Sequence, residues 1–323
     1  MLRPAHPRSR PRLGGLGSVC LALLASCATV SLDDPDRELA AAEAALAARE
    51  PGRALAVLQK HDVQSFPSRL RDRFDHLRIQ AHAEAGDPDA AFTVAETFAD
   101  RHPHSDLRPQ IGERIWQLAV AVLARDGGLW PFWSDRRSSR TMLEHLITRY
   151  PEHVRTADAL RQLGDLAYDD RNHALAQERY RDLLRRCPNS EWVKYASFRY
   201  AMSLFAGLQG PDYDLDQIEH TRRELEAFLG GKPENPEFVK AAATALQQVI
   251  AWQAERHLRV AHFYRTIGNL HGQRLHLEIA AGAPLAGTAA HTRARTELAE
   301  LPELPTPADP EVPNRTAASE ARR

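Results

Sequence analysis

Between Leu160 and Ser190 the apolar positions recur every three or four residues, which predicts two short amphipathic helices joined by a polar turn. The apolar positions are Leu160, Leu163, Leu166 and Ala167 in the first helix, and Leu175, Ala176, Tyr180, Leu183 and Leu184 in the second. Gly164 and Ala176 are small residues placed where two antiparallel helices must approach closely, and Tyr180 supplies the bulk beside them. Pro188 ends the second helix because proline cannot continue one.

Gly164, Ala176, Tyr180 and Pro188 are separated by 12, 4 and 8 residues. These offsets are typical of the tetratricopeptide repeat, a helix–turn–helix unit of about 34 residues. One such unit cannot bury its own apolar face, so the stretch predicts neighbouring helix pairs.

Further helix pairs are predicted on both sides of this unit. The first is expected to begin at Pro35, with Asp34 as N-cap, and to turn at Pro51-Gly52. A later turn is expected at Gly86-Asp87-Pro88. The prolines expected to end successive pairs are Pro67, Pro103, Pro151, Pro188, Pro233 and Pro284. The predicted fold is therefore all-α, a tetratricopeptide-like helix-pair solenoid of about five to six repeats.

Residues 237–267 contain neither Gly nor Pro. We therefore expect the second helix of the fifth pair to continue into the first helix of the sixth. The predicted organisation is N-terminal helical repeats over 35–150, C-terminal tetratricopeptide-like repeats over 151–301 and a disordered proline-rich tail over 302–323.

The start of the chain has the pattern of a secretory signal. Residues 1–12 contain four arginines and no acidic residue, and residues 13–26 are an apolar run too short to span a bilayer. We predict a signal peptide over residues 1–26.

The apolar run ends in Leu24-Ala25-Ser26-Cys27, which resembles the lipobox of bacterial lipoproteins. The resemblance implies cleavage before Cys27, lipid attachment to Cys27 and a lipidated linker over residues 27–34. Two or more acyl chains on one residue give stable membrane anchoring. Ala28, rather than an aspartate, follows the cysteine and favours the outer membrane. The alternative is an ordinary secretory signal with a chance cysteine.

The charge and cysteine content of the chain indicate neither nucleic-acid binding nor a reactive thiol. The full chain has a net charge of −1, and removal of the four arginines of the signal gives −1 − 4 = −5. This mixed, slightly acidic chain lacks the basic footprint of a nucleic-acid-binding protein. After processing, Cys187 is the only free thiol, so no intramolecular disulfide is possible, and its place at a helix end indicates a structural residue.

No catalytic or metal motif stands out, so we expect neither an enzyme nor a cofactor nor a small-molecule substrate. His102 and His104 lie in a turn without a further ligand placed beside them by the sequence. The last repeat holds four more histidines that lack HExxH spacing and are expected to be surface or partly buried: His257, His262, His271 and His276.

Asp212, Asp214 and Asp216 resemble the start of a calcium loop. The loop fails because its sixth residue is not glycine and its twelfth is Arg223 rather than glutamate. Asp216 is better explained as a helix N-cap, with Glu219 completing a capping box.

An insertion over residues 126–138 interrupts the third helix pair with aromatic residues, Trp130, Phe132 and Trp133. Aromatic side chains on an irregular insertion can anchor a partner protein. They can instead pack against the third pair, which is the interpretation we favour. They remain the candidate partner-binding residues.

The lipobox, the helix pairs, the run AERHLRVAHFYRTIGN and the loop GPDYDLDQIEHTRRELEAFL together resemble the outer membrane protein assembly lipoproteins, the BamD family. The resemblance covers about residues 150–300 best, and the aromatic insertion is similar to a variant branch. It implies a lipid-anchored scaffold on the periplasmic face of the outer membrane. A barrel-inserting protein would dock on the C-terminal repeats, and unfolded outer-membrane polypeptides would enter a groove of the N-terminal repeats.

A second interpretation keeps the lipoprotein and the repeats but changes the partner. Such a protein would organise the cell envelope through division and peptidoglycan coordination or through secretin piloting. Stacked helix pairs form an extended surface that suits a peptide or a partner helix in either case.

Overall fold

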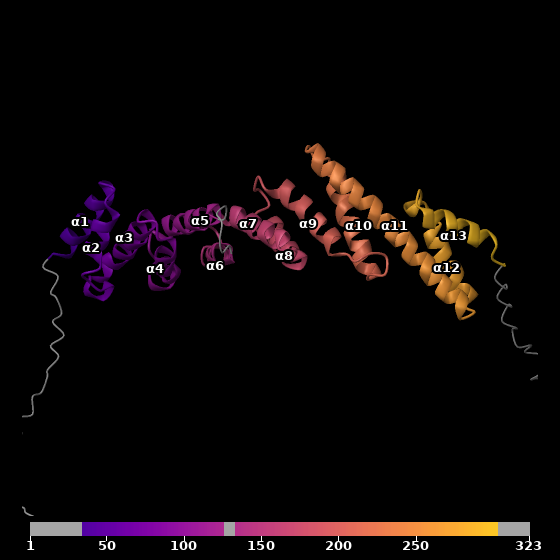
Figure 1. Cartoon of the computed structure of the whole chain (residues 1–323), viewed down its shortest axis with the longest axis horizontal. Coiled ribbons are helices and arrows are strands. Elements are labelled where there is room, and N and C mark those ends of the chain that lie inside the picture. The colour runs from indigo at the N-terminus through magenta and orange to yellow at the C-terminus, as the bar shows by residue number, and fades with distance from the viewer. Residues whose placement is uncertain (1–33, 126–132, 303–323) are drawn as a thin grey trace, which may run out of the picture.

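The structure is a computed structural model that describes residues 34–125 and 133–302. Within these ranges it contains thirteen α-helices, three short 3₁₀ helices and no strand. The helices follow one another along an elongated array from α1 at one end to α13 at the other (Figure 1). Successive helices pack mainly against their neighbours in the chain, which confirms the predicted all-α helix-pair solenoid.

The helices have the following bounds: α1 Pro35–Ala47, α2 Pro51–Leu58, α3 Arg71–Glu84, α4 Pro88–Arg101, α5 Arg108–Ala124, α6 Trp133–Arg149, α7 Thr156–Asp169, α8 His173–Arg186, α9 Val193–Gly207, α10 Leu215–Gly230, α11 Pro236–Thr266, α12 Leu270–Ala280 and α13 Ala289–Ala299. The 3₁₀ helices are Val63–Ser65, Ser68–Leu70 and Ala283–Leu285.

Side-chain caps begin several of the helices where the sequence predicts them. Asp34 caps α1 by accepting a hydrogen bond of 3.1 Å from the backbone N–H of Arg37. Asp87 caps α4, so the turn predicted at Gly86-Asp87-Pro88 is confirmed at Gly86 and Asp87, whereas Pro88 is already the first residue of α4. The turn predicted at Pro51-Gly52 is wrong, because Pro51 is the first residue of α2. Proline is favoured there, since the first helical N–H has no partner within the helix.

The predicted N-cap of α10 is also wrong by two residues. Asp214, not Asp216, accepts the hydrogen bond from the N–H of Gln217, at 3.2 Å. Asp216 lies in the first turn of the helix. Ile218 and Leu225 of this helix are fully buried in the core.

Apolar side chains form a chain of cores along the solenoid. The N-terminal core lies between α1, α2 and α3, and the largest extends from α3 to α9. Two smaller cores follow, one between α9, α10 and α11 and one between α11, α12 and α13. Each helix pair is therefore stabilised by its neighbours, as expected of a solenoid.

Helix α11 is a single element of 31 residues, about 46 Å long at 1.5 Å per residue. The expectation of one long helix over 237–267 is confirmed, but its predicted join to the fifth pair is wrong. Helix α10 ends at Gly230, and α11 starts afresh at Pro236 with Asn235 as N-cap. One long helix thus packs against α10 with its first half and against α12 with its second.

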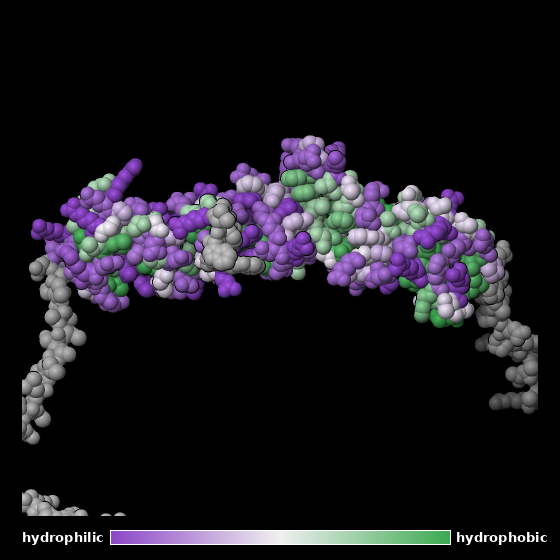
Figure 2. Space-filling view, in the orientation of Figure 1, coloured by the Kyte–Doolittle hydropathy of each residue, from purple (hydrophilic) through white to green (hydrophobic). Residues whose placement is uncertain are grey.

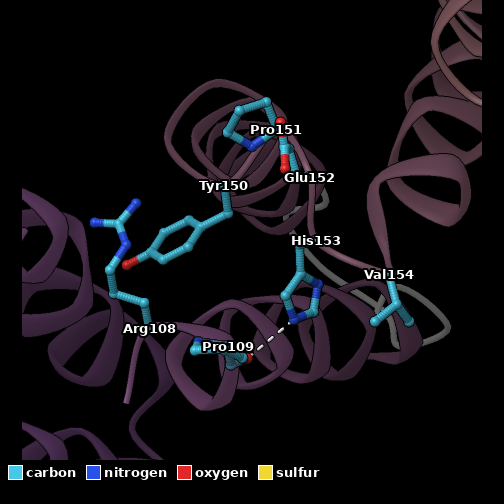
Figure 3. Close-up of a pocket in the computed structure, with 7 residues that line it drawn as sticks. All are labelled: Arg108, Pro109, Tyr150, Pro151, Glu152, His153 and Val154. Atoms are coloured by element: carbon cyan, nitrogen blue, oxygen red, sulfur yellow. Dashed lines mark hydrogen bonds between the residues drawn. The ribbon is translucent and has the colours of Figure 1, made fainter. Parts of the chain in front are cut away.

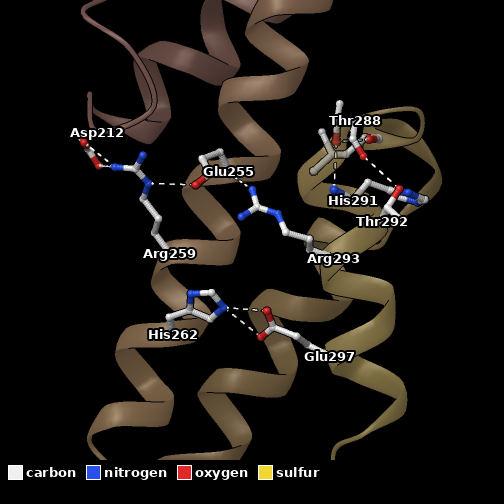
Figure 4. A network of polar contacts seen from close by, with 10 residues as sticks. Asp212, Glu255, Arg259, His262, Thr288, His291, Thr292, Arg293 and Glu297 are labelled. Atoms are coloured by element: carbon white, nitrogen blue, oxygen red, sulfur yellow. Dashed lines mark hydrogen bonds and ion pairs between the residues drawn. The ribbon is translucent and has the colours of Figure 1, made fainter.

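Helix α13 lies within the predicted repeat region, after Pro284, where the last helix pair is expected to end, and it covers one side of the α11–α12 hairpin. A chain of ion pairs joins Asp212, Arg259, Glu255 and Arg293, and a separate contact of 2.9 Å joins His262 to Glu297 (Figure 4). Residues on α11 thereby contact both the loop before α10 and, through Arg293 and Glu297, helix α13. Asp212, which begins the rejected calcium motif, serves in this network.

Several predicted segments lie outside the described residues: the signal peptide, Cys27 and nearly all of its linker, and the tail after Pro302. The irregular insertion predicted over 126–138 is wrong for residues 133–138, which form the first turns of α6. In the described parts of the chain, the helices are too short or too polar to cross a membrane.

Candidate protein-interaction site

A direct contact between a glycine and a tyrosine closes the α7–α8 pair. A Cβ atom at Gly164 would lie only 2.6 Å from Cε1 of Tyr180, so glycine is needed for the ring to fit. Tyr180 and Ala176 are both fully buried, as is most of the apolar face predicted for these helices. The predicted packing of this pair is confirmed.

Asp165, the residue after that glycine, gathers polar groups from three helices. Its Oδ1 atom accepts hydrogen bonds of 2.7 Å from the hydroxyls of Tyr180 and Tyr195, and Arg161 donates to Oδ2 at 2.6 Å. Burial and the neighbouring carboxylate raise the pKa of both tyrosines, so both stay protonated donors. Sequence analysis missed this cluster, whose only local signal is the i, i+4 spacing of Arg161 and Asp165.

Arginine–aromatic contacts extend the cluster and place α7 beside α9. The guanidinium carbon of Arg199 lies 4.0 Å from the ring centroid of Tyr168, and that of Arg161 lies 4.4 Å from Trp192. The indole N–H of Trp192 donates to Asp158 at 2.7 Å. The first helices of successive pairs therefore form one face that is rich in aromatic and charged side chains.

On this face a groove of about 440 Å³ lies between α9 and the first half of α11. Met202 and Phe205 line it from α9, and Ala241 and Ala245 line it from α11. The two alanines leave room that a larger side chain would fill. Hydrophobic surface is visible over this part of α9 and α11 (Figure 2).

The groove has a charged entrance and an aromatic end. Glu237 and Lys240 lie at the start of α11, where they also line the groove. At the other end Phe205 stacks on Trp252, with 5.7 Å between ring centroids. An apolar floor bordered by charges of both signs suits the apolar face of a partner helix.

A second hollow, of about 560 Å³, lies between the start of α5 and the turn after α6. Tyr150 points toward Arg108 and His153 toward Pro109, whose carbonyl lies 2.9 Å from the imidazole (Figure 3). Burial raises the pKa of Tyr150 to about 12. Its buried hydroxyl has no hydrogen-bond partner among the described residues.

The predicted site residues are mostly not placed by the structure. Cys27, Trp130 and Phe132 lie outside the described residues, and Trp133 is known only as the first residue of α6. Their roles remain predictions. The groove between α9 and α11 lies where the sequence named no site residue.

The histidine and cysteine candidates have packing partners. His102 lies 2.9 Å from the buried carboxylate of Asp75, and His257 lies 3.1 Å from His276. In the described ranges, no three His, Cys, Asp or Glu side chains are grouped so as to hold a metal ion. Cys187 is partly buried, and burial raises the pKa of its thiol.

One protein family matches part of the chain. Residues 133–270 match the model of the YfiO family, described as an outer membrane lipoprotein. The matched segment runs from the start of α6 to the start of α12 and is less than half of the chain. It overlaps the region that resembles the assembly lipoproteins in sequence, and it contains the α9–α11 groove.

No curated protein matches the chain. Among solved structures that match is the crystal structure of the P58(IPK) TPR domain, which is 14% identical with a TM-score of 0.27. The alignment covers 83% of this chain and 66% of that one, so this chain spans slightly less than two thirds of its length.

Proposed function

We propose that this protein is a lipid-anchored periplasmic scaffold that binds partner proteins during the assembly of outer-membrane β-barrels. It performs no catalysis, and Cys27 carries the lipid that holds it to the periplasmic face of the outer membrane. The observation that supports this proposal most is the α9–α11 groove, which lies within the segment matched by an outer membrane lipoprotein family.

The groove is suited to docking by one helix or loop of a folded partner. The cluster around Asp165 holds α7 and α9 in place through hydrogen bonds and ion pairs, so the groove's α9 wall is fixed before binding. A preformed site loses less conformational entropy on association than a flexible one. We assign this groove to the barrel-inserting protein, and the N-terminal repeats to unfolded outer-membrane polypeptides.

Co-purification from detergent-solubilised membranes tests the proposal. The tagged chain is compared with a Met202→Glu, Thr244→Trp double variant, which places a charge and a bulky ring in the groove. We expect the parent to recover the barrel-inserting protein and the variant to lose most of it. Val120→Glu, an exposed position on α5, is the matched control and should recover the partner normally.

Recovery of only secretin or peptidoglycan-associated partners by the parent would overturn the proposal in favour of another envelope scaffold. Recovery of the barrel-inserting protein by both the parent and the groove variant would retain the function and reject the groove as its site.

A further inference from the structure

Four of the six large hydrophobic side chains that are exposed among the described residues lie on one hairpin, α11–α12. Phe263 is 59% exposed and Ile267 57%, one turn apart at the end of α11. Leu275 is 48% exposed and Ile279 39%, one turn apart on α12. Isolated exposed hydrophobic residues are ordinary, but a concentration on one element indicates a contact surface.

Aromatic contacts connect one of these residues, Phe263, to α12. The ring of Phe263 lies against Tyr264 at 5.7 Å, and Tyr264 stacks on His276 of α12 at 5.6 Å. Tyr264 also packs over Gly272, where a Cβ atom would lie 2.6 Å from the ring. The apolar residues therefore belong to a rigid pair of helices rather than to a loose loop.

The hairpin differs on its two sides. Toward α13 it buries an apolar core that includes Leu258 and Leu277, beside which lie the ion pairs of Glu255 with Arg293 and of His262 with Glu297 (Figure 4). The four exposed apolar residues take no part in this network. One apolar side of the hairpin is therefore covered by α13, and the four exposed residues lie outside that core.

The end of the hairpin projects from the array. Arg259 pairs with Asp212, just before α10 begins, and α11 continues for seven more residues beyond that point. The turn between α11 and α12 is the lowest point of this end of the solenoid in Figure 1, and hydrophobic surface lies along the same edge in Figure 2. A projecting apolar edge can enter the boundary between lipid headgroups and acyl chains without a complementary cavity.

The charge of the hairpin is opposite to that of the chain. Residues 254–280 contain four arginines and two glutamates, a net charge of +2, whereas the whole chain carries −1. Arg256 has no ion-pair partner among the described residues, and Arg265 has only a long one of 3.8 Å to Glu297. Basic amphipathic helices are typical of contact with anionic membrane surfaces.

We propose that the α11–α12 hairpin binds the surface of an anionic phospholipid membrane. Phe263, Ile267, Leu275 and Ile279 enter the interface between headgroups and acyl chains, and Arg256 and Arg265 contact lipid phosphates. The site lies at the opposite end of the solenoid from α1 (Figure 1). It goes beyond the proposed function, since it requires neither the lipid on Cys27 nor a protein partner.

Vesicle co-sedimentation tests this proposal with the full mature chain carrying Cys27→Ala, which has no lipid of its own. Vesicles of phosphatidylcholine alone are compared with vesicles containing phosphatidylglycerol. We expect binding to the anionic vesicles and a loss of about tenfold or more in Phe263→Ser, Ile267→Ser, because binding scales with buried apolar area. Arg256→Gln, Arg265→Gln should weaken binding about fivefold per arginine, from about 1 kcal/mol for each.

The matched control is Val120→Ser, Val154→Ser, which removes two exposed apolar residues from other elements and should bind like the parent. Circular dichroism establishes that each variant is folded. Failure of the parent to bind anionic vesicles overturns the proposal, as does equal binding by the serine variant and the parent. Loss of a co-purified protein from the serine variant with unchanged vesicle binding would assign the face to a protein partner instead.

Discussion

A contact between a glycine and a tyrosine joins the two helices in both the α7–α8 pair and the α11–α12 hairpin, but other helices cover this contact to different extents. In each, a glycine on one helix admits the ring of a tyrosine on the other, and a Cβ atom would lie 2.6 Å from that ring. Tyr180 of the first pair is fully buried, whereas Tyr264 of the second is partly exposed.

The difference comes from the next helix in the array. Helix α9 brings Tyr195 and Arg199 over the first pair, so that Asp165 and Tyr180 are enclosed in a polar cluster. The α11–α12 hairpin has α13 on one side only. The same glycine–tyrosine packing therefore lies inside the solenoid in the α7–α8 pair and beside an exposed surface in the α11–α12 hairpin. Which surface is free to bind depends on the helix that packs next to each pair.

The largest effect should come from removing the enclosed ring. Tyr180→Ala removes a fully buried side chain and leaves Asp165 without one of its donors, so we expect a loss of about 4 kcal/mol in the free energy of unfolding. Tyr264→Ala should cost less than half as much, because its ring is partly exposed. Urea denaturation followed by circular dichroism measures both, and equal losses would contradict the comparison.

A second difference lies in the response of the hairpin to acid. His257 is 4% exposed, and burial, together with His276 and Arg256, lowers its pKa to about 4. In the unfolded chain His257 binds a proton near pH 6.5, whereas in the folded hairpin it stays neutral down to about pH 4. The free energy of unfolding therefore falls as the pH drops from about 6.5 toward 4. The loss is bounded at roughly 3 kcal/mol.

His257→Gln provides the control for this acid effect, because glutamine stays neutral in both states. Unfolding midpoints of parent and variant are compared at pH 7 and pH 4.5. We expect the parent to lose more stability than the variant between the two pH values. An identical loss in both would show that other groups determine the acid response.

Local sequence patterns were sufficient for much of the fold. The spacing of Gly164, Ala176, Tyr180 and Pro188 predicted the packing of one helix pair correctly, because those contacts lie within a single repeat. Asp34 likewise predicted the first N-cap. The errors at Pro51 and Asp216 are shifts of a helix start, where neighbouring residues are all acceptable caps or first-turn residues.

Local sequence patterns did not predict the candidate site. The groove between α9 and α11 joins residues about 40 positions apart, and small residues such as Ala241 and Ala245 carry no signal of a binding floor. Asp165 was missed because its partner Tyr195 comes from the next repeat, 30 residues later. Which face of α12 is exposed depends on where α13 packs, and the spacing of apolar residues in the sequence does not indicate that position.

The smallest effect, and the most selective, should come from the two glycines themselves. Gly164→Ala forces a methyl group against a ring that Asp165 and Arg199 hold in place, which costs more than the roughly 1 kcal/mol that alanine gains in a helix. We expect a net loss of about 2 kcal/mol. Gly272→Ala meets Tyr264, whose partly exposed ring can turn outward, so the two terms nearly cancel. If both variants lose the same stability by urea denaturation, the ring of Tyr264 is held as tightly as that of Tyr180, and the contrast between the two helix pairs is wrong.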